Sequence, residues 1–195
     1  VALDTGWSFS WIVAGLSLGL LAAGLVAPRI GHIIKARGGR PILIAGSLFF
    51  VVGLLVMGLA PNLWVFLASW VIMGLGMAAG LYDPAFSTLG RLYGHGARNL
   101  ITGLTLFGGF ASTLGWPLAA FFVESFGWRG ACFCFAAIHL CITLPLHLFA
   151  VPKEESGTPP EVMADSSHPS PAKAPPRRLF MLLALTTLLS AFLST

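Results

Sequence analysis

The polar residues with the most regular spacing lie in an uncharged segment, residues 99–123. Steps of three and four residues place them along one face of a helix. They are Thr102, Thr105, Gly109, Ser112 and Trp116. Hydroxyl groups next to an indole can hydrogen-bond a solute that passes along such a face. The same hydroxyls can instead bond their own helix backbone or a neighbouring helix, and the spacing leaves both interpretations open.

A second and weaker polar face is expected in residues 7–28. Its members are Ser10, Ala14, Ser17 and Gly24. Close packing is the favoured explanation, because small residues allow two helix backbones to approach. Ser17 is kept as a further candidate for a solute path.

The composition indicates a membrane protein. Of the 195 residues, 56% are hydrophobic and 9% are charged, and the mean hydropathy is +0.87. An ordinary soluble domain carries about 25% charged residues. The sequence is basic, with a pI near 9.4, but its basic residues lie in short segments between apolar runs and form no continuous face, which argues against a nucleic-acid partner. The lipid bilayer is therefore the expected surroundings.

Uncharged runs long enough to cross a hydrocarbon core of about 30 Å predict an all-α bundle of transmembrane helices. These helices are expected at about 7–28, 41–60, 63–85, 99–123 and 130–151. Residues 153–178 are rich in Pro, Ser and charges, a composition that buries too little surface to fold, and are predicted to be a disordered cytoplasmic linker. Residues 179–195 are predicted to begin a further transmembrane helix that is cut short. The chain is thus expected to be a fragment.

The basic residues favour one side of this bundle. Ten of the 11 lysines and arginines fall within residues 29–40, 91–98 and 153–178, and the exception is Arg129. The positive-inside rule places those segments in the cytoplasm. We therefore expect a multi-pass protein of the plasma membrane.

Asp83 is the one acidic residue at the end of the long uncharged run that begins at Pro41. Counted from Leu63 at 1.5 Å per residue, Asp83 lies about 30 Å along a helix, which predicts a position at the cytoplasmic edge of the membrane core. Arg91 and Arg98 follow in the next loop. An ion pair or a gate is favoured over a proton site, because a carboxyl at the edge remains in contact with water.

The sequence also repeats at an offset of 89 residues. Gly19, Leu25, Pro28, Gly38 and Arg40 recur as Gly108, Leu114, Pro117, Gly127 and Arg129. Because the two copies are three spans apart, they cross the membrane in opposite directions, which defines an inverted repeat of three plus three helices. The helix that would complete the first copy is expected upstream of Val1.

The loop from Pro28 to Pro41 reads PRIGHIIKARGGRP. It resembles the signature loop of the major facilitator superfamily, G-x-x-x-D-R-x-G-x-R. Gly31, Gly38 and Arg40 match this pattern, whereas a lysine stands in place of its aspartate. The resemblance implies that these three residues act in gating or coupling, and they join Asp83 and Arg98, which are candidates for the same role because of their position.

Within that superfamily, four segments are similar to bacterial relatives of the monocarboxylate transporters. They are GWS from Gly6, GLYDPAF at 80–86, Ala97-Arg98 followed by Thr102-Gly103, and FGWR at 126–129. Drug-proton antiporters are less similar, because Trp70 stands where they carry an arginine. The resemblance implies the N-terminal half of such a transporter, whose first helix and C-terminal half lie outside this chain. It also implies that the helix at 99–123 lines the cavity, which favours the solute-path interpretation of its polar face.

The remaining polar residues are given no chemical role. His139 and His147 are interpreted as packed or interfacial residues rather than a proton relay. Glu124 and Arg129 flank one turn and can pair with each other. Cys132, a neighbour of two further cysteines in the same span, is interpreted as a packing residue.

The sequence carries no nucleotide-binding G-x-x-x-x-G-K, no H-E-x-x-H and no arguable serine hydrolase set, so no enzyme activity, cofactor or metal is assigned. The expected function is secondary transport of a small anionic organic solute by alternating access. The anion follows from the monocarboxylate resemblance alone. The alternative is a membrane scaffold or sensor that keeps the fold without transport.

Overall fold

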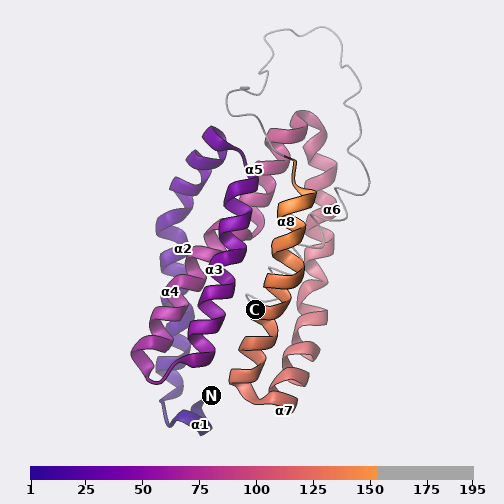
Figure 1. Ribbon diagram of the computed structural model, residues 1–195. Coiled ribbons are helices and arrows are strands. Elements are labelled where there is room, and N and C mark those ends of the chain that lie inside the picture. The colour runs from indigo at the N-terminus through magenta and orange to yellow at the C-terminus, as the bar shows by residue number, and fades with distance from the viewer. Residues whose placement is uncertain (153–195) are drawn as a thin grey trace, which may run out of the picture.

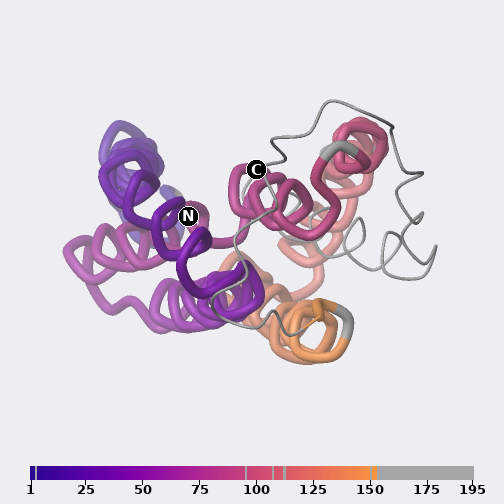
Figure 2. The backbone as a smooth tube through the Cα atoms, turned by 90° about the horizontal axis from the view of Figure 1, so that it is seen from above, coloured from indigo at the N-terminus to yellow at the C-terminus, as the bar shows by residue number. Residues whose placement is uncertain are grey.

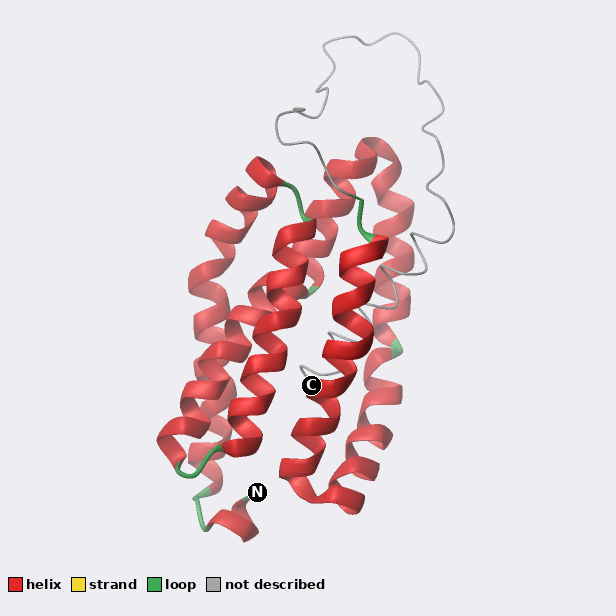
Figure 3. Cartoon of the chain, in the orientation of Figure 1, coloured by secondary structure: helices red, strands yellow, loops and turns green. Residues whose placement is uncertain are grey.

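The computed structural model of the chain describes residues 1–152, apart from the side chains of Leu3, His95, Phe107, Ser112 and Ala150. All of the secondary structure in this range is helical (Figure 3). The elements are α1 (Ala2–Thr5), α2 (Phe9–Arg37), α3 (Arg40–Leu59), α4 (Leu63–Gly80), α5 (Tyr82–Tyr93), η1 (Gly94–Gly96), α6 (Ala97–Gly109), α7 (Ala111–Ile138), η2 (His139–Thr143) and α8 (Leu144–Ala150). The predicted linker at 153–178 and the predicted helix start at 179–195 lie outside the described residues.

The helices cross the bundle in alternating directions (Figure 1). The chain rises along α2, descends along α3 and rises again along α4 and α5. It then descends along α6 and the first part of α7, and returns through the rest of α7, η2 and α8. The upper end in this view carries the turns at Gly38 and at Gly94–Gly96, and the lower end carries α1 and the turn at Gly127.

Four segments of the described residues are long and apolar enough to cross a membrane. They are Phe9–Arg37, Arg40–Leu59, Leu63–Tyr93 and Thr113–Phe149. The last of them includes Gly127, whose backbone is not helical and where the chain reverses. The all-α membrane bundle predicted from the sequence is thereby confirmed.

Several helix ends differ from the expected ones. The helix expected at 7–28 continues through Pro28 to Arg37. The helix expected at 63–85 is interrupted at Leu81, because Pro84 has no N–H to bond the carbonyl of Gly80 one turn earlier. The helix expected at 99–123 is interrupted at Phe110, directly after two glycines, which are poor helix formers.

Helices α2 and α4 approach each other through glycine. A Cβ atom at Gly74 would lie 2.2 Å from the carbonyl oxygen of Gly19, and one at Gly15 would lie 2.3 Å from the Trp70 ring. Neither atom can be accommodated without moving a backbone or an indole. The close contact of α2 is therefore made by Gly15 and Gly19, with Trp70 filling the space beside them. The face of Ser10, Ala14, Ser17 and Gly24, for which packing was expected, does not pack in this way, because Ser10, Ser17 and Gly24 are exposed and a Cβ added at Gly24 would meet no atom within 4 Å.

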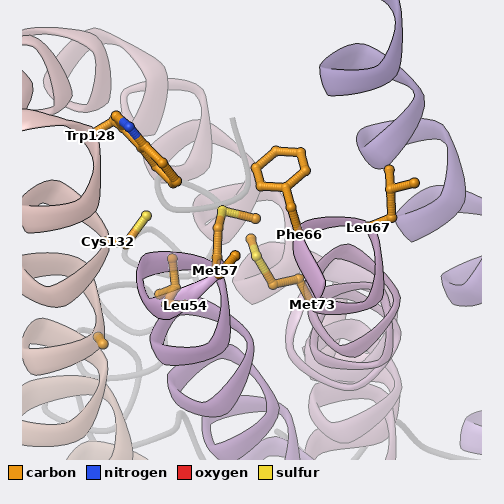
Figure 4. Packing of buried hydrophobic residues seen from close by; sticks show 9 residues of the cluster. Leu54, Met57, Phe66, Leu67, Met73, Trp128 and Cys132 are labelled. Atoms are coloured by element: carbon orange, nitrogen blue, oxygen red, sulfur yellow. The ribbon is translucent and has the colours of Figure 1, made fainter. Parts of the chain in front are cut away.

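An apolar cluster closes the lower end of the bundle. It joins α3, α4 and α7 through residues such as Met57, Phe66 and Trp128 (Figure 4). The Phe66 ring centroid lies 5.4 Å from that of Trp7 and 6.5 Å from that of Trp128. The tryptophans of the GWS and FGWR segments therefore meet on one phenylalanine, which holds three spans together.

The two copies of the repeat share one unusual backbone conformation. Gly38 has φ 83° and ψ 169°, and Gly127 has φ 70° and ψ 172°. This region of φ and ψ is open essentially to glycine alone. Each glycine is followed two residues later by an arginine that enters the next span, Arg40 after the first and Arg129 after the second.

These two arginines bind the ends of each other's spans. Arg129 donates from Nη1 to the carbonyl of Gly58 at 2.7 Å and from Nη2 to that of Ala60 at 2.8 Å, at the end of α3. Arg40, at the start of α3, donates to the carbonyl of Leu148 near the end of α8. Because the last carbonyls of a helix lack partners within the helix, each guanidinium satisfies groups that the partner span leaves open. We call this pair of contacts the arginine clasp.

Replacement of Arg129 by alanine is expected to lower the free energy of unfolding by about 1–3 kcal/mol, because two helix-end carbonyls lose a charged donor. Arg129→Lys should recover only part of this loss, since one ammonium group does not reproduce the two-pronged contact. The measurement is denaturant unfolding of the full-length protein that contains this chain, in detergent. Arg29→Ala, at an exposed residue of α2, is the matched control. Equal stability of Arg129→Ala and Arg29→Ala would contradict the role of the clasp.

Candidate functional site

The polar face predicted at 99–123 spans two helices. Thr102 and Thr105 lie on α6 and are exposed, and Trp116 on α7 is 68% exposed. The side chain of Ser112 lies outside the described part of the structure. The opposite side of these helices is buried, with Leu104, Gly108 and Ala111 facing the bundle. The described members of the predicted face therefore point away from the core of this half-bundle.

The threonine hydroxyls on this face already have partners. Thr102 Oγ1 donates to the carbonyl of Arg98 at 3.0 Å, and Thr105 Oγ1 donates to that of Ile101 at 2.8 Å. These are bonds to the preceding helical turn, one of the two interpretations that the spacing left open. Each hydroxyl oxygen keeps acceptor capacity for a further donor.

The exposed face of α2 is broad. Only 11% of the residues in the most apolar part of α2 are buried inside the structure, against 56% of those in the most apolar part of α3. Ser17 lies on this open face, whereas Gly15 and Gly19 are buried against α4. The structure thus separates the polar candidate on α2 from the residues that pack.

The span formed by α4 and α5 is a broken helix. Its break at Leu81 lies inside the GLYDPAF segment, where Leu81 has an extended backbone with φ −86° and ψ −160°. Beyond the break, the hydroxyl of Tyr82 lies against Gly108, where a Cβ would meet it at 1.9 Å. Thr88 contacts Gly39 in the same way. Helix α5 is therefore held between α6 and the turn before α3.

Asp83 lies exposed in the first turn of α5. A negative charge at a helix N-terminus is stabilising, because it interacts with the open N–H groups there. Arg91 lies in the last turn of the same helix, about 12 Å further along its axis. Its guanidinium donates to the carbonyl of Lys35 on α2. The structure thus places this carboxylate and this guanidinium at opposite ends of α5.

The other candidates for gating lie around the same upper end of the bundle. Gly31 is partly exposed on α2 and has open space where a Cβ would be added. Gly38 forms the turn before α3, Arg40 belongs to the arginine clasp, and Arg98 is exposed at the start of α6. They surround this end and do not meet at a single point.

Basic charge dominates this end. Arg29, Lys35, Arg37 and Arg98 are all exposed at or near this end, whereas Asp83 lies at the start of α5, at the opposite end of that helix from the turn at Gly94–Gly96. The other acidic residues of the described range, Asp4 and Glu124, belong to elements at the lower end. An uneven distribution of this kind raises the local concentration of anions.

Sequence reasoning missed the hydrogen bonds of Arg129 and the polar seam to which the two packed histidines belong. Arg129 bonds the end of α3, a role that the repeated Gly-x-Arg spacing could have indicated. His139 and His147 are 0% and 2% exposed, and with Thr143 they recur every four residues. That spacing, on a span otherwise apolar, was the available signal for a buried polar seam.

Comparison with known proteins places the chain in a family. The family model of the Major Facilitator Superfamily matches residues 1–195. Monocarboxylate transporter 11 of Mus musculus is 33% identical over 165 residues, which is 81% of this chain and 34% of the relative. Monocarboxylate transporter 3 of Rattus norvegicus is 33% identical over 143 residues, 71% of this chain and 27% of the relative.

A third relative, monocarboxylate transporter 1 of Mus musculus, is 34% identical over 125 residues, 63% of this chain and 24% of the relative. The chain thus spans between 24% and 34% of the length of these relatives. No solved structure matches it significantly. The match of the family model, the identity to these relatives and the all-helical membrane bundle agree, and the chain belongs to the Major Facilitator Superfamily.

Proposed function

We propose that the full-length protein containing this chain is a secondary transporter that moves a small monocarboxylate-like anion by alternating access. The observation that carries the proposal is the 33% identity to monocarboxylate transporter 11 over 81% of the chain. Three of the four segments that resemble this group also build the structure, because Trp7 and Trp128 close the lower end and residues 80–86 contain the break between α4 and α5. We propose that this membrane is the plasma membrane. The resemblance of the sequence to bacterial transporters suggests more narrowly the bacterial inner membrane.

The geometry supports a path along the open faces of α2, α6 and α7. Thr102 and Thr105 are exposed on α6, Trp116 is exposed on α7, and Ser17 is exposed on α2. The Trp116 indole and the acceptor oxygens of the threonines can bond a solute, and the basic upper end attracts an anion. The remaining half of the transporter, which is expected outside this chain, would complete the path.

A scaffold or sensor without transport is the second candidate. It is favoured by the bonds of Thr102 and Thr105 to their own helix, because these hydroxyl protons already have acceptors and do not require a solute. An uptake experiment separates the two.

Vesicles that contain the full-length protein should accumulate one or more short-chain monocarboxylates several-fold above vesicles without it. A panel of monocarboxylates, dicarboxylates and neutral analogues should be offered with and without an imposed proton gradient. Stimulation by the gradient would identify the coupling ion. Folded protein that moves no member of the panel would favour the scaffold.

Cysteines introduced by Thr105→Cys and Trp116→Cys should react with a water-soluble thiol reagent, and a transported solute should slow the reaction. Cys132, Cys134 and Cys141 are first replaced by alanine. Leu104→Cys, next to Thr105 but 1% exposed, is the matched control and should stay unreacted. Protection of all three positions would show that this face packs against lipid or another helix.

Asp83 is proposed to be a gating charge at the cytoplasmic end. Asp83→Asn is expected to reduce transport several-fold with expression retained, because the first turn of α5 loses its negative charge. Asp4→Asn, at the other end of the bundle, is the control. Transport by Asp83→Asn that equals the unmodified protein at every pH tested would leave only a structural role for this carboxylate.

A further inference from the structure

A buried polar seam runs between α3 and the segment formed by η2 and α8. The His139 ring stacks on that of Phe50, with centroids 4.9 Å apart and an interplanar angle of 7°. Both side chains are 0% exposed. One helical turn beyond His139 lies Thr143, also 0% exposed, and one turn further lies His147.

His147 shows how polar groups in this seam are satisfied. Its Nδ1 lies 2.8 Å from Ser47 Oγ on α3, and that hydroxyl also lies 3.2 Å from the carbonyl of Leu43. Ser47 and His147 thus form one level of the seam, at which a polar side chain of each helix has a protein partner.

The next level of the seam, formed by His139 and Thr143, lacks such a partner. Nδ1 and Nε2 of His139 and Oγ1 of Thr143 are buried and have no hydrogen-bond partner among the described residues. A neutral imidazole offers one donor and one acceptor, and a hydroxyl offers both. Buried polar groups of this kind are paired in nearly all structures, with protein or with ordered water.

The backbone at this point has a matching irregularity. Residues His139–Thr143 form a π-helical turn, in which the N–H of Leu144 bonds the carbonyl of His139. Such single π turns in α-helices often mark functional sites. The wider turn brings residues four apart close to the same face, which is the relation between His139 and Thr143.

We propose that this level of the seam is an internal water site, with one water molecule bound between the His139 ring and the Thr143 hydroxyl. Water fits the chemistry, because it both donates and accepts and needs two to four polar partners. A metal cation does not fit, because no group of three or more metal-ligating side chains occurs in the described residues.

The site is distinct from the proposed solute path. The path candidates lie on α2, α6 and α7, whereas the water site lies between α3 and η2. The arginine clasp closes this seam at both ends, through Arg40 at the upper end and Arg129 at the lower. The water is thus held inside the bundle and does not belong to a column open to solution.

Phe50 connects the site to α4. Its ring packs on two glycines of that helix, where added Cβ atoms would lie 3.2 Å from it at Gly76 and 3.4 Å from it at Gly80. Gly80 directly precedes the break at Leu81. A water that fixes the His139 ring therefore also fixes the surface against which the broken helix rests.

X-ray hydroxyl-radical footprinting of the full-length protein tests the site, because radiolysis of a bound water oxidises the side chains that touch it. His139 should be oxidised several-fold more than His147, which is 2% exposed and bonded to Ser47. The excess should shrink in Thr143→Val, where the water loses one of its partners. Equal oxidation of His139 and His147 in the unmodified protein would overturn the proposal.

Thermal unfolding gives an independent readout. Thr143→Val alone should lower Tm by about 2–4 °C, because the water and the imidazole lose a partner. The same change in the His139→Phe background should have little effect, since the apolar ring no longer needs one. Thr105→Val, at an exposed hydroxyl bonded to its own helix, is the matched control. An equal loss in both backgrounds would show that the two side chains share no bound water.

Discussion

The arginine clasp is the interaction on which the arrangement of the described helices depends. A helix inside a membrane must satisfy its last carbonyls without bulk water, and lipid offers no donors. Here the start of each of two antiparallel spans supplies the donors that the end of the other lacks, through Arg40 and Arg129. The contact requires each arginine to follow a sharp turn, and the positive φ of Gly38 and Gly127 provides it. The inverted repeat thus has a direct physical expression as two equivalent turns and two equivalent caps.

Within the frame that the clasp fixes, the other helices approach closely enough to require glycine. Gly74 meets the backbone of Gly19, and Gly108 meets the hydroxyl of Tyr82. Two membrane helices gain little from burying apolar side chains that lipid would solvate equally well, so close packing carries the association. The span formed by α4 and α5 takes part in most of these contacts, and it is also the one that breaks, at Leu81.

Polar groups divide between two environments. Those on α2, α6 and α7 face outward from the described bundle, along the proposed solute path. Those between α3 and the segment of η2 and α8 face inward and are sealed, with Ser47 and His147 paired across the seam. Exposure therefore separates residues available for recognition from residues that define the packing of the two clasped spans.

The sequence by itself determined the fold class, because runs of apolar residues of membrane length leave an all-helical bundle as the solution. It also determined the family, through local segments such as GLYDPAF and FGWR, and it indicated the inverted repeat through the spacing of Pro, Gly and Arg. Only the tertiary structure decided where the helices break and what the polar side chains bond. Arg129 reaches carbonyls 69 and 71 residues away, and Arg40 reaches one 108 residues away. Helical periodicity describes one helix at a time, so it carries no information on partners so distant along the chain. For the same reason it placed Thr102 and Thr105 on one face correctly as neighbours, but could not show that their hydroxyls bond their own helix or that His139 lies sealed against Phe50.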